Sequence, residues 1–280
     1  MLLSTLLRDY LSAREVSREY GKSLTAVVLE FGRWLKRSAR VSDFSDAKVN
    51  AWLTALVSAN GRSRSTLANK RRQLLTLWRY AWQEEHAKQP PRKVRRISVP
   101  APSPAAWDTP ELRRVIAAAR CVPGKFRRTK IERAKFWEAF VRVGYSSGLR
   151  LGDLVRLRWE QIRANGIAVV SQHKTGNLVL CPLDASALAA LEGIRLPHRS
   201  RVFGDCLNRR RTMKGFIAIV RAAGLTGGSK MLRRSGATAV AIASPGWESA
   251  FLGHVDQRTA RHYVDRAMCQ QRKPTPPPID

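Results

Sequence analysis

The segment SGLRLGDL at residues 147–154 is the first of four motifs that decide the fold and chemistry of this chain; the others are HKTG at 173–176, KMLRRSGAT at 230–238 and LGH at 252–254. A single tyrosine, Tyr263, follows the last motif by nine residues. Arginine matches two oxygens of a phosphate at once and stays protonated at any relevant pH. A phenol can attack phosphorus and keep the bond energy as an ester. Together these residue types indicate chemistry on a phosphodiester.

The chain between the motifs carries one clear β signal within a mainly helical pattern. The runs IAVVS at 167–171 and LVLC at 178–181 flank the HKTG motif, which predicts a β-hairpin with that motif at its tip. Apolar residues at helical spacing, with capping residues before them, predict helices around this hairpin. Their expected ranges are 108–120, 130–145, 151–157, 185–191, 214–223, 233–243 and 257–268.

In this order and spacing, the four motifs and Tyr263 resemble the tyrosine recombinases, the phage-integrase family of DNA strand-exchange enzymes. The resemblance covers about residues 107–268. It implies a mainly α fold with a small β-hairpin or sheet, and a mixed α+β catalytic domain. It also implies that Arg150 and Arg233 clamp the scissile phosphate. Tyr263 would be the nucleophile that forms a 3′-phosphotyrosyl bond and frees a 5′-hydroxyl.

Two further residues have roles that the resemblance implies. Lys174, at the hairpin tip, would protonate the leaving 5′-oxygen as a general acid. His254 would donate a hydrogen bond to the scissile phosphate or assist in removing the tyrosine proton. We expect no cofactor and no metal, because arginine and lysine supply the positive charge that metals give in many nucleases.

The third motif departs from the usual pattern of the family, which is His-x-x-Arg-His. Lys230 occupies the first histidine position and Arg234 the second. Lysine can donate to a phosphate oxygen but is a poor base near neutral pH. Asp153 stands where the family usually has glutamate, and we expect it to support Arg150 or Arg233.

The first hundred residues predict a small helical bundle, with helices expected at 23–40, 45–57 and 65–81. It resembles, more loosely, the core-binding domain of the same family. A basic, proline-rich stretch then breaks the helical pattern, because proline cannot continue a helix. We therefore expect four parts: a helical DNA core-binding domain at 1–89, a linker at 90–106, the catalytic domain at 107–268 and a flexible tail at 269–280.

The charge of the chain points to a polyanionic partner. It has 51 basic and 21 acidic residues among 280, a net charge of +30. Such an excess favours nucleic acid, here double-stranded DNA. Strand exchange needs two duplexes with two subunits on each, so we expect a homotetramer; accessory proteins cannot be identified. The expected DNA contacts outside the catalytic motifs are Arg64, Lys70, Arg71, Arg72, Lys93, Arg95, Arg96, Arg127, Arg128, Arg210 and Arg211.

Several other classes of protein are disfavoured. No apolar run approaches the ~18 residues that a membrane span needs. The four cysteines form no CxxC pair, so we expect no zinc site and reduced thiols in the cytoplasm. No phosphate-binding loop of the GxxxxGK type is present, which disfavours ATP or GTP as fuel.

The sequence thus predicts a site-specific DNA recombinase or integrase, an enzyme that cleaves and rejoins strands. Two alternatives remain. A type IB topoisomerase would use the same covalent chemistry but reseal the same strand. A DNA-binding protein that has lost catalysis would explain Lys230 and Arg234.

Overall fold

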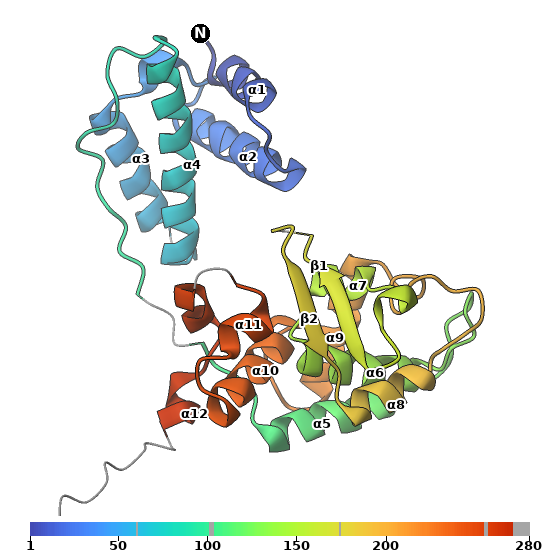
Figure 1. The fold of residues 1–280 in the computed structure, drawn as a ribbon. Coiled ribbons are helices and arrows are strands. Elements are labelled where there is room, and N and C mark those ends of the chain that lie inside the picture. The colour runs from blue at the N-terminus through green and yellow to red at the C-terminus, as the bar shows by residue number, and fades with distance from the viewer. Residues whose placement is uncertain (60, 101–103, 174, 255–256, 271–280) are drawn as a thin grey trace, which may run out of the picture. The chain divides into compact units, whose positions relative to one another are not determined.

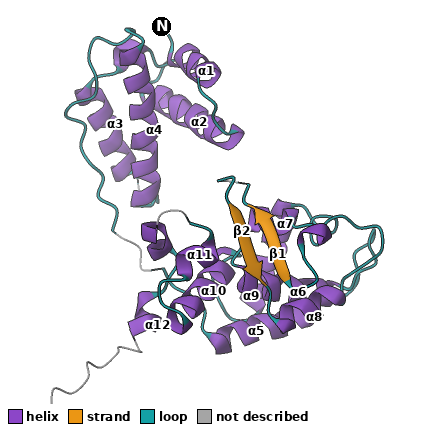
Figure 2. Ribbon diagram, in the orientation of Figure 1, coloured by secondary structure: helices purple, strands orange, loops and turns teal. Residues whose placement is uncertain are grey.

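The computed structural model describes residues 1–59, 61–100, 104–173, 175–254 and 257–270, and it divides into two compact units. The first unit is Met1–Ala101 and the second begins at Pro102. Figures 1 and 2 show helices in both units and strands in the second. The mainly helical class with one small sheet is therefore confirmed.

The first unit is a bundle of helices around an aromatic core (Figure 1). Phe31 lies edge-on against Trp52, and Phe44 stacks on Trp78, with ring centroids 5.4 and 5.5 Å apart. Ser45 caps the third α-helix, as its position before an apolar pattern predicted. The elements are α1 (Leu3–Ala13), α2 (Arg18–Trp34), η1 (Val41–Asp43), α3 (Asp46–Ser58) and α4 (Arg64–Gln83).

Two details at the starts of these helices differ from expectation. Helix α1 was not predicted, although Leu3, Leu6 and Leu7 have the i, i+3, i+4 spacing of a buried helix face. Helix α4 begins at Arg64, one residue before the expected start, and is capped by Ser63, whose hydroxyl accepts from the backbone N–H of Thr66.

The chain after α4 folds back onto the bundle instead of leaving it. The indole of Trp78 donates to the carbonyl of Gln89 at 2.8 Å. The Asn50 amide pairs with the backbone of Lys93 and Arg95, both at 2.9 Å. The first part of the proline-rich segment is thus attached to α3 and α4.

The second unit packs helices around an antiparallel pair of strands, β1 (Ile167–Ser171) and β2 (Leu178–Pro182), as Figure 2 shows. The hairpin was predicted at these positions. Phe136, Phe140, Phe203 and Phe216 form a chain of ring contacts, three of them at 5.5 Å, in the core. The other elements are α5 (Thr109–Arg120), α6 (Arg133–Ser147), α7 (Leu151–Arg156), η2 (Trp159–Gln161), α8 (Ala185–Glu192), α9 (Arg209–Ala222), α10 (Lys230–Ala243), α11 (Glu248–Leu252), η3 (Gln257–His262) and α12 (Arg266–Gln270).

The single helix predicted for 257–268 is wrong. The structure has a 3₁₀-helix to His262, then three residues outside any helix, then α12. Asp265 causes the break, because its carboxylate accepts from the N–H groups of Ala267 and Ala106. Its own N–H donates to the hydroxyl of Thr238 at 2.8 Å. Aspartate competes with helix formation through such local bonds.

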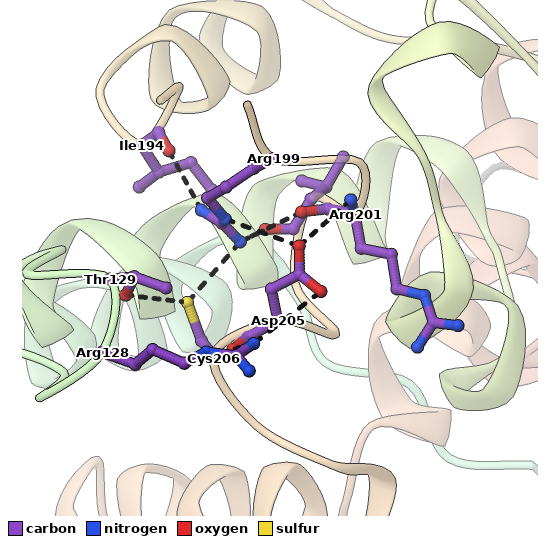
Figure 3. A network of polar contacts seen from close by, with 8 residues as sticks. Arg128, Thr129, Ile194, Arg199, Arg201, Asp205 and Cys206 are labelled. Carbon is purple, nitrogen blue, oxygen red and sulfur yellow. Dashed lines mark hydrogen bonds and ion pairs between the residues drawn. The ribbon is translucent and has the colours of Figure 1, made fainter. Parts of the chain in front are cut away.

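Arg199 organises the irregular loop between α8 and α9 (Figure 3). Its side chain is 8% exposed, and one terminal nitrogen donates to the carbonyls of Val202 at 2.7 Å and Arg201 at 3.0 Å. Its Nε lies 3.8 Å from the Asp205 carboxylate. The Asp205 carbonyl also accepts from Arg128, at 2.7 Å. Arg199 therefore holds the loop together, and Arg128 joins it to the segment before α6.

We predict that Arg199→Met destabilises the second unit by about 2–4 kcal/mol, because buried carbonyls lose their donor while the apolar stem remains. The measurement is urea unfolding of the full chain. Arg201→Met is the matched control, because Arg201 has an exposed side chain in the same loop, and we expect a change within about 0.5 kcal/mol. Equal midpoints for the two variants would contradict this account of the loop.

Candidate active site

Tyr263 lies at the centre of a cluster of positive side chains. It is half-buried just after η3, where the helix is interrupted. The guanidinium carbon of Arg233 is 4.8 Å from the centroid of its ring, and Nζ of Lys230 is 5.1 Å from it. The His254 ring lies 5.2 Å away, centroid to centroid. The third and fourth motifs therefore meet around the phenol.

Arg233 is held rigidly from inside the second unit. It is 2% exposed on α10, and its guanidinium donates to the carbonyls of Gly148 and, at 2.8 Å, Leu252. Burial, with the nearby charge of Arg150, lowers the pKa of Arg233 to about 10. The side chain therefore remains protonated at neutral pH.

The glycines of the motifs allow these close approaches. Gly148 ends α6 with φ of +60°, and a Cβ there would lie 2.5 Å from the ring of Phe251. Gly253 ends α11 with φ of +62°, and a Cβ there would lie 2.3 Å from Val179. Both positions need a left-handed backbone and no side chain, which only glycine supplies without strain.

Arg150 approaches the phenol from the start of α7, where its own position is the N-cap. Its side chain is half-buried and donates to the side-chain oxygen of Gln172. Its charge also acts on the phenol of Tyr263, whose pKa it lowers. The first motif thus joins the same cluster as the third and fourth.

The electrostatics of the cluster favour ionisation of the phenol. Burial alone would raise the pKa of Tyr263. The charges of Arg233, Arg150 and Lys230 outweigh that effect, so the pKa of Tyr263 lies below its ordinary value. A lowered pKa activates an oxygen nucleophile.

His254 is neutral at physiological pH. Burial and the charges of Arg233, Arg150 and His262 lower its pKa to about 4. Its Nε2 is 3.1 Å from a terminal nitrogen of Arg233, which can only donate, so Nε2 accepts and the proton is assigned to Nδ1. Nδ1 is buried without a hydrogen-bond partner among the described residues.

The hairpin tip carries the HKTG motif next to this cluster. Lys174 lies outside the described residues. The preceding N–H, of His173, donates to the buried carboxylate of Asp153 at 2.9 Å. Asp153 thus contacts the hairpin, and its charge also acts on Arg233 by raising that residue's pKa against the effect of burial. Where we expected support for an arginine alone, the structure gives Asp153 a role in placing the hairpin.

Sequence reasoning missed Gln172. It is 1% exposed, and its amide contacts both Arg150 and the Leu252 carbonyl. Residues Ala168 and Val170 face the core from β1, so Gln172 continues the inward positions of that strand. A polar residue at an inward position of an alternating strand is the signal that could have identified it.

Some of the predicted DNA contacts serve the fold. Lys70 forms an ion pair with Glu30, and Arg71 donates to the carbonyls of Arg95 and Val94 at 2.7 and 3.0 Å. Both side chains are half-buried, and the ion pair of Lys70 with Glu30 links α2 to α4; its contact with DNA stays a prediction. Arg128 donates to the Asp205 carbonyl. The others have exposed side chains: Arg64, Arg72, Lys93, Arg95, Arg96, Arg127, Arg210 and Arg211.

The described part of the chain has neither a group of metal-ligating side chains nor a membrane-spanning helix. Within the described ranges, no three or more His, Cys, Asp and Glu residues are grouped as metal ligands would be. In the same ranges, every helix is too short or too polar to cross a bilayer. The cluster around Tyr263 is instead built from cations.

Comparisons with known proteins agree with the geometry of the cluster. The model of the phage integrase family matches residues 126–269, just over half of the chain. No curated protein sequence matches the chain. The fold is similar to that of a lambda integrase (75–356) dimer bound to a COC' core site, with a TM-score of 0.75, 19% identity and 100% of both chains covered.

Two further solved structures share the fold. The Tn1549 transposon integrase in complex with circular intermediate DNA has a TM-score of 0.75 and 14% identity, over 98% of this chain and 100% of that one. XerA recombinase has a TM-score of 0.51 and 16% identity, over 98% of both chains. At these identities the likeness establishes the fold, and the family match establishes the kind of protein. This chain belongs to the phage integrase family, and it is a tyrosine site-specific recombinase.

Proposed function

We propose that Tyr263 cleaves one strand of duplex DNA and forms a 3′-phosphotyrosyl bond, freeing a 5′-hydroxyl. The observation that supports this most strongly is the placement of one phenol among Arg150, Arg233 and Lys230, with its pKa lowered by their charges. The residue proposed as nucleophile and the cations proposed to bind the phosphate therefore lie together.

The two arginines would stabilise the charge that develops on the non-bridging oxygens. Preorganised donors aimed at developing charge are commonly the largest catalytic contribution. Arg233 is preorganised, because the carbonyls of Gly148 and Leu252 fix its guanidinium before DNA arrives. Lys230, exposed at the start of α10 and beside the phenol, can add a third donor.

The proton movements follow from the same groups. The bond from the Tyr263 oxygen to phosphorus forms while the bond from phosphorus to the 5′-oxygen breaks. The phenol loses its proton, which His254 would accept at Nε2 by giving up the contact with Arg233 there; alternatively, its Nδ1–H would donate a hydrogen bond to the phosphate. Lys174 would give a proton to the departing 5′-oxygen. Attack of a 5′-hydroxyl from another duplex reverses these steps and joins the exchanged strand without ATP.

The partners in this proposal are DNA and other copies of the chain. Related folds are described as a lambda integrase dimer bound to a core site and a lambda integrase tetramer bound to a Holliday junction. We infer a homotetramer on two duplexes for this chain, and a cytoplasmic location, where its four free cysteines stay reduced. The exposed basic residues of both units would contact phosphates, which give affinity with little sequence choice.

We predict that Tyr263→Phe abolishes the covalent complex while fold and DNA affinity persist. The change removes one oxygen and almost no volume, and the described groups around this phenol are cations and an imidazole, with no second hydroxyl among them. The measurement is adduct formation on a pool of nicked duplexes of random sequence, with sequencing of the trapped strands. Thermal melting and salt-dependent DNA binding are the controls. An adduct formed by this variant would remove Tyr263 as the nucleophile.

The odd third motif gives a separate prediction. Lys230→Ala removes a charged donor from the transition state, so the activation free energy of adduct formation should rise by about 2–4 kcal/mol. The single-turnover rate should therefore fall roughly 30- to 1000-fold. Lys230→His should retain substantial cleavage, since histidine is the usual residue of the family at this position.

Lys135→Ala is the matched control for this series, because Lys135 is an exposed lysine on α6 whose partner is Glu132. We expect an unchanged rate for it. If Lys230→Ala also cleaves at the rate of the unmodified protein, Lys230 is a surface lysine and the third motif acts through Arg233 alone.

A further inference from the structure

Gln172 is a buried polar residue that neither the motif pattern nor the proposed chemistry includes. It is the first residue beyond β1, where the strand enters the turn of the hairpin, and is 1% exposed. Burying an amide is costly unless its donor and acceptor are both satisfied. The hydrogen-bond partners of the Gln172 amide therefore indicate its role in the structure.

The two ends of the Gln172 amide join the two arginines of the site. Its Nε2 donates to the Leu252 carbonyl at 3.0 Å, and the same carbonyl accepts from Arg233 at 2.8 Å. Its Oε1 accepts from Arg150 and, at 3.1 Å, from the hydroxyl of Thr175. A continuous path of hydrogen bonds thus runs from Arg150 through Gln172 and the Leu252 carbonyl to Arg233.

The chemistry of the partners fixes the orientation of this amide. A guanidinium can only donate and a backbone carbonyl can only accept, so reversing the amide would break both contacts. Glutamine suits both partners, because its neutral side chain is long enough to reach Arg150 and Leu252 and carries an acceptor and a donor on one planar amide. Gly253 leaves room for it, because a Cβ at that position would lie 2.8 Å from Nε2 of Gln172.

The backbone of Gln172 also holds the hairpin tip. Its carbonyl accepts from the N–H of Gly176 at 2.8 Å and from that of Thr175 at 3.2 Å. Its own N–H donates to the Asn177 carbonyl at 2.8 Å. The residue that contacts Arg150 therefore also closes the turn that carries the second motif.

We propose that Gln172 is a positioning residue for strand cleavage: it holds the Arg150 guanidinium against the phenol of Tyr263 and in register with Arg233. Two guanidinium groups of like charge repel each other, and Arg150 is only half-buried, so without an acceptor its side chain is free to move toward solvent. This inference rests on the proposed role of Tyr263 as the nucleophile.

The first test needs no DNA. Gln172→Met keeps the length and shape of the side chain and removes its three hydrogen bonds, with Arg150, Leu252 and Thr175. The groups that face the phenol are Arg233, Arg150, Lys230 and His254, and loss of the Arg150 contact should shift the pKa of Tyr263 upward. Ultraviolet titration of tyrosinate reports this, with the Tyr263→Phe protein subtracted to remove the other four tyrosines.

The second test uses adduct formation on the pool of nicked duplexes. We expect Gln172→Met to slow it by about 100-fold, the effect of misplacing a catalytic group by about 1 Å, with DNA affinity unchanged. In an Arg150→Ala background the same substitution should cause no further loss, because the two side chains act as one unit. Gln172→Glu keeps an acceptor for Arg150 and should cleave faster than Gln172→Met.

Asn177→Ala is the matched control. Asn177 carries the same amide in the same hairpin and donates to the Gly253 carbonyl at 3.4 Å. Its removal should leave both the Tyr263 titration and the rate of adduct formation unchanged.

Two results would overturn the proposal: a Tyr263 titration unmoved by Gln172→Met, or a full additional loss of rate in the Arg150→Ala background. If the unmodified protein forms no adduct on any duplex, the proposed function fails instead, and the titration still decides whether Gln172 positions Arg150.

Discussion

The carbonyl oxygen of Leu252 is the point on which the site depends. It accepts from Arg233 on α10 and from Gln172 at the end of β1, at 2.8 and 3.0 Å. A guanidinium buried as deeply as that of Arg233 must find acceptors, because an unpaired charge inside a protein is very costly. The Gly148 carbonyl at the end of α6 supplies another acceptor. The hydrogen bonds of Arg233 therefore hold together three segments that are distant in sequence: α10, the end of α6 and the end of α11.

Arg150, Arg233 and Lys230 concentrate positive charge around Tyr263, where the negatively charged phosphate of DNA would bind. Burial and the charge of Arg150 lower the pKa of Arg233, and burial and the charges of both arginines lower the pKa of His254. Tyr263 responds in the opposite sense, since its ionised form is attracted to the same cations. A phosphodiester with charge developing on its oxygens would relieve the repulsion, which is the physical basis of transition-state stabilisation here.

The sequence predicted much of this fold because its strongest signals are local. The capping box of Asp108 and Glu111, the alternation in β1 and β2, and the caps of several helices act within a few residues. The break at Asp265 was missed because its partners, Thr238 and Ala106, are distant in sequence. Lys70 looked like one more basic residue because its partner Glu30 lies forty positions away. Gln172 was missed for the same reason, since its importance comes from Arg150 and Leu252.

The central claim is that the cations of the first and third motifs activate Tyr263 and no other residue. Mapping the covalent link tests it most directly: the trapped protein–DNA adduct is digested with nuclease and trypsin, and the modified peptide is identified by mass spectrometry. Trypsin should release His262–Arg266, with sequence HYVDR, as the one peptide carrying a nucleotide remnant, linked at Tyr263. A remnant on any other peptide would contradict the account.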